Sequence, residues 1–194
     1  MTRNATSRKR PDPRAEATRR QLAAAVLELA SQRDLHHITI SDIAQRAGVN
    51  RATVYLHSAD RDSLLATALE PWIAQIAELA AHCCPKRSTA PAATPPPQLV
   101  ALFEEFERQA PLLRRVLGDN GSGKLINRIF HTLRDHMSHH LSTDGHAATI
   151  PHDLHAAYLS GAILGVLRYW LSRDTTPPVP EIAATTWKLI NNTP

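Results

Sequence analysis

The stretch from Thr39 to Leu65 constrains the fold of this chain more than any other, because it fixes two short helices and the turn between them. Ser41 is a residue type that often caps a helix N-terminus, and apolar residues then recur at helical spacing up to Gly48. A glycine at this point can adopt the left-handed conformation that ends a helix. Asn50 can then cap a second helix over residues 51–57, so the pattern predicts a helix-turn-helix unit.

The second helix of this unit is too short to be stable alone in water, so it must be held by packing. We expect Val54 to supply its buried side, against residues of the neighbouring helices: Ile43, Val49 and Leu64 or Leu65. Its outer face is rich in hydrogen-bond donors: Arg51, Thr53, Tyr55 and His57. Such a face suits the acceptor-rich base edges and phosphates of a DNA duplex. A small helical hairpin inside a larger bundle is the alternative.

About 60 residues, from Arg14 to Ala74, resemble the DNA-binding domain of TetR-family transcriptional regulators. The resemblance rests on the run GVNRATVYLHSADRDSLL and on ITISDIAQRA before it. The family usually shows a pattern like T-x-x-D-I-A-x-x-A-G-V-S-x-x-T-x-Y-x-H-F-x-x-K-x-x-L. Ser58 departs from it by replacing an aromatic or large apolar residue, which predicts looser packing of the following link. Arg61 replaces the usual lysine and adds a planar fork that can bind phosphate with two hydrogen bonds.

The resemblance implies a DNA-binding surface built from eight residues: Ser41, Asn50, Arg51, Ala52, Thr53, Tyr55, His57 and Arg61. By residue type, Arg51 can reach guanine O6 and N7, and Thr53 can contact a phosphate or a thymine methyl. The resemblance places Tyr55 and His57 on the phosphate backbone, with Ser41 and Arg61 flanking them. We therefore expect most of these contacts to anchor the helix rather than to read the base sequence.

The N-terminal residues 1–13 are expected to form a flexible basic arm. The net charge of the chain is only +4, but the first twenty residues carry a surplus of basic side chains: Arg3, Arg8, Lys9, Arg10, Arg14, Arg19 and Arg20, against Asp12 and Glu16. Such a concentration of positive charge suits a polyanionic partner, and a merely solvated tail is an equal alternative.

The remainder of the chain reads as successive helices, with apolar residues at helical spacing between turns and prolines. No segment reads as a strand pair, so we predict an all-α chain of about nine helices. One helix should continue from Arg61 and bend near Pro71, and the segment from Pro85 to Pro97 should be an extended loop. We expect an arm, a three-helix helix-turn-helix domain and a helical regulatory and dimerisation domain, over residues 1–13, 14–74 and 75–194.

Small residues recur every four positions along one predicted helix near the C-terminus, at Ala157, Gly161 and Gly165. Two helices can approach closely along such a strip. The resemblance implies that the last two helices form a homodimer through a four-helix bundle with their copies, and this strip would suit that contact. Packing of the strip inside one chain is the alternative.

Another predicted helix carries side chains that could bind a metal: His131, Asp135, His136, His139 and His140. His136 and His140 lie four residues apart on one helix face. The apolar stripe of this helix runs elsewhere, so we expect these residues to face water or a cavity mouth, and we expect no metal. A disulfide between the adjacent Cys83 and Cys84 would be strained, and a thiol sensor there is a weak alternative.

Motifs for catalysis are absent from the sequence, including a nucleophile elbow, a Walker loop and a zinc-protease helix. We therefore expect neither an enzyme nor a cofactor. The longest apolar run, about Ala156 to Leu171, contains Arg168 and is shorter than the roughly 20 residues of a membrane span. With no signal-peptide core at the N-terminus, we expect a cytoplasmic protein with no membrane partner.

Together, the residues and the resemblance predict a homodimeric transcriptional regulator, most often a repressor in this family, that binds a palindromic operator in double-stranded DNA. The resemblance implies that a small-molecule effector enters the C-terminal helices, moves the helix that follows Arg61 and changes the separation of the two reading helices. The sequence names neither the effector nor the operator. The alternatives are a ligand-independent architectural DNA-binding protein and a helical protein-interaction module.

Overall fold

A computed structural model of the chain describes residues 13–83, 94–118, 120–143, 150–173 and 177–191. Within these residues every regular element is helical, which confirms the all-α prediction. The described elements are a 3₁₀ turn, η1 (Leu35–His37), and nine α-helices: α1 (Pro13–Gln32), α2 (Ile40–Ala47), α3 (Arg51–His57), α4 (Arg61–Ala81), α5 (Pro97–Arg108), α6 (Ala110–Leu117), α7 (Gly123–Thr143), α8 (His152–Leu171) and α9 (Val179–Asn191).

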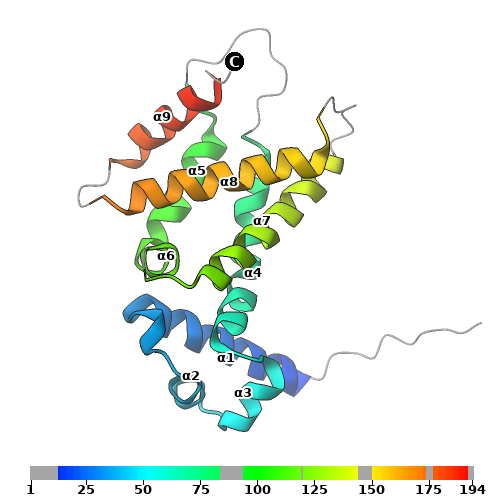
Figure 1. Cartoon of the computed structure of the whole chain (residues 1–194), viewed down its shortest axis with the longest axis vertical. Helices are drawn as coiled ribbons and strands as arrows, with labels where there is room; N and C mark the ends of the chain where they lie inside the picture. The colour runs from blue at the N-terminus through cyan, green and yellow to red at the C-terminus, as the bar shows by residue number, and fades with distance from the viewer. Residues whose placement is uncertain (1–12, 84–93, 119, 144–149, 174–176, 192–194) are drawn as a thin grey trace, which may run out of the picture.

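The first three helices form one end of the molecule, around the beginning of α4 (Figure 1). Their shared core consists of side chains with almost no exposed surface, including Leu22 and Val26 of α1, Ile43 of α2, Val54 of α3 and Leu65 of α4. Burying apolar side chains of this size from several helices stabilises short elements that would not persist alone. The predicted packing of Val54 is thus confirmed.

The remaining helices pack together as a second group, and α4 connects this group to the first three helices (Figure 1). Helix α4 packs along α7, which packs along α8, while α6 lies between α1 and α8. Phe103 stands edge-on to Phe106 and Trp170, with ring centroids 5.9 and 5.5 Å apart, and all three rings are buried. None of the described helices is both long enough and apolar enough to cross a membrane.

Helix α4 runs without a break through Pro71, and it spans the boundary that we placed between residues 74 and 75. The bend near Pro71 and the domain division stay predictions. The basic arm lies outside the described residues except for Pro13, where α1 begins. Most of the predicted extended loop also lies outside them, and α5 begins at its last residue, Pro97.

Candidate nucleic-acid interface

Thr39 caps α2, so the expected cap at Ser41 is wrong. The Thr39 hydroxyl accepts a hydrogen bond from the Asp42 N–H at 3.2 Å, and the Thr39 N–H donates to Asp42 Oδ2 at 2.8 Å. The bond from the Thr39 N–H, and next a bond that the Thr39 hydroxyl donates to Asp42 Oδ2 at 2.8 Å, hold the pKa of Asp42 below its usual value. The sequence did contain a signal for this cap, namely the spacing of threonine and aspartate, because a reciprocal cap needs an acceptor side chain three residues after the capping residue. Ser41 lies exposed within the first turn of α2.

The turn between α2 and α3 has the predicted chemistry. Gly48 has φ +67°, the left-handed conformation that favours glycine, and its N–H bonds to the carbonyl of Gln45 at 3.2 Å. Asn50 caps α3, because its side-chain Oδ1 accepts the N–H of Ala52 at 3.0 Å. The turn therefore fixes the direction of α3 relative to α2.

Helix α3 buries one side and presents the other to solvent at the end of the molecule (Figure 1). Val54 is 0% exposed, whereas Tyr55 is 54% exposed and Leu56 is 84% exposed. Of the other predicted contact residues in α3, two are exposed and two are half-buried: Arg51 and Ala52, then Thr53 and His57. We did not single out Leu56, although its position two residues after Val54 places it on the opposite face.

Arg61 is already engaged by the protein itself. Its Nε and Nη2 atoms donate to Asp62 Oδ1 at 2.8 and 2.7 Å, and its Nη1 donates to the carbonyl of Leu35. The side chain is 23% exposed, so in this structure it ties η1 to the start of α4 rather than presenting a free fork. A phosphate contact by Arg61 would have to displace these partners and stays a prediction.

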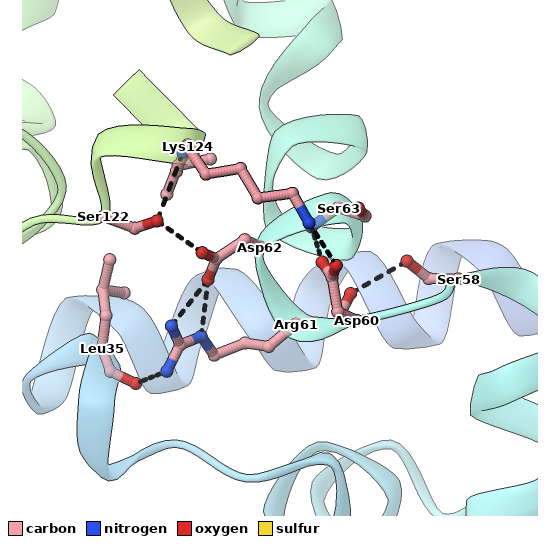
Figure 2. Close-up of polar contacts among 9 residues, drawn as sticks. Leu35, Ser58, Asp60, Arg61, Asp62, Ser63, Ser122 and Lys124 are labelled. Carbon is pink, nitrogen blue, oxygen red and sulfur yellow. Dashed lines mark hydrogen bonds and ion pairs between the residues drawn. The ribbon is translucent and has the colours of Figure 1, made fainter. Parts of the chain in front are cut away.

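Polar side chains join the start of α4 to the start of α7 (Figure 2). Lys124 Nζ lies 2.6 Å from Asp60 Oδ2, and the Ser122 hydroxyl donates to Asp62 Oδ2 at 2.5 Å. Asp60 also caps α4 by accepting the Ser63 N–H at 2.7 Å. The bond from Lys124, and next the bond from the Ser63 N–H, lower the pKa of Asp60 from 3.8 to about 2. We call these contacts of Asp60 and Asp62 with Lys124 and Ser122 the α4–α7 junction.

Ser58 contributes to the same link, at the end of α3. Its N–H bonds to the Val54 carbonyl at 2.9 Å, and its hydroxyl donates to the Asp60 carbonyl at 3.0 Å (Figure 2). At the position where the resemblance leads one to expect a large apolar residue, this chain uses hydrogen bonds. The polar replacement therefore has a structural use that the resemblance did not indicate.

An exposed apolar face runs along α8. Gly161 and Gly165 are exposed, Ala157 is half-buried, and the same helix exposes Leu154, Tyr158 and Tyr169 at 57 to 60%. A Cβ atom added at Gly161 or Gly165 would meet no atom within 4 Å. Packing within this chain therefore does not require either glycine.

A small apolar cavity of about 20 Å³ lies among five helices. Its lining includes Leu69, Trp72, Ile73 and Ile76 of α4, and the other residues come from α5, α6, α7 and α8: Phe106, Leu113, Leu117, Ile129, Leu133, Ile163, Leu164 and Leu167. The indole N–H of Trp72 donates to Glu105 Oε1 at 2.8 Å, so it is satisfied without a ligand. A cavity of this size holds about one water-sized probe, which is far less than an organic ligand needs.

The described histidines that lie close enough to another potential ligand to share a metal ion are at η1 rather than on α7. Among the described residues, the potential metal ligands that come together are Asp34, His36 and His37, with their ligand atoms within 4.8 Å of one another. Both histidines are exposed, and the α7 histidines form no such group in the described part of the chain. The expected absence of a metal stays a prediction. Cys83 is buried, and Cys84 lies outside the described residues.

Comparisons with known proteins match both ends of the chain. The profile of bacterial regulatory proteins of the tetR family matches residues 22–68, and the profile of a transcriptional regulator C-terminal region matches residues 93–192. The chain is 31% identical over 178 residues to the uncharacterized HTH-type transcriptional regulator YxbF of Bacillus subtilis (strain 168). This alignment covers 91% of the chain and 45% of YxbF, so the chain spans about half the length of that relative.

Solved structures share the fold. A TetR transcriptional regulator from Rhodococcus sp. RHA1 superposes with a TM-score of 0.64 at 16% identity, covering 94% of this chain and 99% of that one. FadR from Bacillus subtilis, solved in complex with stearoyl-CoA, superposes with a TM-score of 0.54 at 17% identity, covering 89% and 97%. At these identities the likeness concerns the fold alone.

Proposed function

The chain belongs to the tetR family of bacterial regulatory proteins, a family of DNA-binding transcriptional regulators, and we propose that it is a repressor that binds a palindromic operator as a homodimer and is released by a small-molecule effector. The observation that carries the proposal is that α3 has one buried and one exposed side: Val54 is fully buried, while Tyr55 and Leu56 are exposed. A packed helix with one free face at the end of a domain can enter the major groove of DNA.

Dimerisation would allow the protein to recognise a longer DNA sequence than one copy of α3 can contact. At about 1.5 Å per residue α3 is only about 10 Å long, so one copy spans a few base pairs. Two copies related by a two-fold axis would read an inverted repeat with half-sites about one turn of DNA apart. The exposed apolar face of α8, with Gly161 and Gly165 open to close approach, supports this contact.

Release by an effector is supported by the position of the cavity. Its lining includes residues of α4, and α4 also begins at the α4–α7 junction beside the first three helices. Because the cavity is only about 20 Å³, a ligand would have to separate its walls, and α4 is one of them. Binding would then favour a different placement of α4 and of the reading helix. FadR of the same fold was solved with stearoyl-CoA, which supports a ligand with an apolar portion.

The proposal is tested by selecting genomic DNA fragments that the purified protein retains. A repressor of this kind should return a short inverted repeat, bound by two protein chains. Scattered AT-rich fragments would indicate an architectural protein instead, and no retained DNA would indicate a protein-interaction module. Compounds with an apolar portion, both uncharged ones and acyl-CoA thioesters, should release the DNA when they are added to the protein–operator complex, and failure of a broad set to do so would remove the effector from the proposal.

A further inference from the structure

Leu56 is the most exposed large apolar side chain among the described residues, at 84%. The other such side chains lie next to it, at Tyr55, or in the C-terminal half of the chain from Ile150 onward. Helix α3 therefore presents a highly exposed aliphatic side chain on the surface that faces DNA in the proposed function. Hydration of an exposed leucine side chain is unfavourable, so a partner that covers this side chain binds more tightly.

The geometry of α3 aims Leu56 at the floor of the groove. Successive helical residues are about 100° apart, so Leu56 and Ala52 both lie roughly 160° from the buried Val54 and about 40° from each other. The polar contact residues of α3 lie to either side of this direction, nearer to the flanks: Arg51, Thr53, Tyr55 and His57. Seated by its buried side, the helix would thus point its two apolar side chains at the base edges and its polar ones toward the groove walls.

The base edges offer one apolar group in the major groove, the C5-methyl of thymine. Any other edge presents donors or acceptors, and leucine against them would remove their water without returning a hydrogen bond. We propose that Leu56, supported by Ala52, determines specificity by packing on a thymine methyl at one fixed position in each half-site. This inference rests on the proposed DNA-binding function and adds a direct base contact to it.

The test removes the methyl from the DNA instead of altering the protein. In the selected operator, each thymine is replaced in turn by deoxyuridine, which keeps the hydrogen-bonding edge and lacks the C5-methyl. We expect one position per half-site at which the loss weakens binding roughly fourfold, the worth of one buried methyl-sized group, and roughly 16-fold when both half-sites are changed. All other replacements should leave Kd within about twofold.

Leu56→Ala then identifies the side chain that reads the methyl. Because both copies of the dimer carry the substitution, this variant should bind the thymine operator at least roughly 16-fold more weakly and should no longer distinguish thymine from deoxyuridine at the sensitive position. Ile150→Ala removes another exposed aliphatic group, 53% exposed, far along the chain from α3, and should behave as the unaltered protein does. Because the deoxyuridine series uses unaltered protein, it is informative even where a variant fails to fold.

Two results would overturn the inference and leave the proposed function standing: operator binding that ignores every thymine methyl, or a Leu56→Ala protein that keeps full sensitivity to deoxyuridine. The second result would assign the methyl to another side chain, such as Thr53. A protein that retains no DNA in the selection would instead overturn the proposed function itself.

Discussion

At the scale of single residues, two hydrogen-bond donors that were both predicted to contact DNA have different surroundings. Tyr55 is 54% exposed beside the reading face, while Arg61 is held by Asp62 and by the carbonyl of Leu35. An exposed phenol can meet a phosphate without losing a partner, whereas the guanidinium would have to exchange one set of bonds for another. The cost of that exchange makes Tyr55 the better candidate for anchoring DNA.

Tyr55→Phe removes only the hydroxyl, so it tests the phosphate contact without changing the shape of α3. We expect about tenfold weaker binding for each half-site, the worth of a hydrogen bond to a charged group, and therefore about 100-fold for the dimer, with equal losses on operator and unrelated duplexes. Fluorescence anisotropy with both duplexes at one salt concentration would measure this. A loss confined to the operator would show that Tyr55 reads bases instead.

Lys124→Met should make the stability of the protein less dependent on pH in acid. The pKa of Asp60 is about 2 in the folded chain against 3.8 ordinarily, so its contribution is complete above pH 3.8 and disappears as the pH falls toward 2. Loss of Lys124 removes the largest cause of this shift, so the folded pKa should rise toward 3.8. Urea unfolding at several pH values should then give a lower free energy near neutrality and a shallower slope between pH 4 and 2.

Lys188→Met is the matched control for that experiment, because it removes the same charge from an exposed position on α9. It should leave the slope in acid as it is in the unaltered protein. If Lys124→Met gave the same slope as Lys188→Met, the α4–α7 junction would have no part in setting the pKa of Asp60.

At the scale of elements, short helices of the N-terminal unit depend on their ends. Helix α2 has eight residues and α3 has seven, so each leaves a large share of its backbone groups unpaired by helical bonds. Thr39 and Asp42 satisfy such groups at one end of α2, and Gly48 does so at the other. The orientation of α3 therefore depends on hydrogen bonds that lie outside α3.

Thr39→Ala should lower the free energy of unfolding by about 1 kcal/mol, the usual worth of an N-cap side chain. Urea unfolding followed by circular dichroism would measure the change. Ser41→Ala is the control and should cost only a few tenths of a kcal/mol, because Ser41 is exposed and does not cap the helix. A larger cost at Ser41 than at Thr39 would contradict the observed cap.

At the scale of the whole molecule, the N-terminal and C-terminal helices expose different kinds of surface. The first three helices bury their shared core and leave α3 facing outward, while α8 leaves an apolar face uncovered. Contiguous apolar surface of this kind usually marks an interface with another protein. In the proposed dimer, the exposed face of α8 sets the distance between two copies of α3.

Gly161→Leu should convert the dimer to a folded monomer. A Cβ atom added at this position would meet no atom of its own chain within 4 Å, and leucine favours a helix over glycine by roughly 0.5–1 kcal/mol, so the fold should persist. A bulky group would, however, hold two α8 helices apart. Sedimentation velocity should show the monomer, and affinity for an inverted repeat should fall by at least about tenfold.

Gly123→Leu provides the matched control, since Gly123 is another exposed helical glycine whose added Cβ atom would meet nothing within 4 Å. It should leave the sedimentation coefficient unchanged. A Gly161→Leu protein that sediments as the dimer would count against this face of α8 as the contact surface.

The sequence by itself determined the features that depend on neighbours along the chain. Gly48 and Asn50 identified the turn, and the spacing around Val54 identified the buried side of α3, because backbone conformation and helical periodicity follow short-range rules. The family resemblance came from the same short stretch. The Thr39 cap was equally local, and its threonine–aspartate spacing could have been recognised.

Tertiary structure alone decided which distant groups meet. Arg61 bonds to a carbonyl 26 residues earlier, and Lys124 meets a carboxylate 64 residues earlier, so no local pattern could assign either partner. The same holds for the open glycines of α8 and for the narrow cavity that borders α4, which exist because of how whole helices pack. Local rules shape each helix, but the distances between side chains of different helices are fixed only when the helices have packed together.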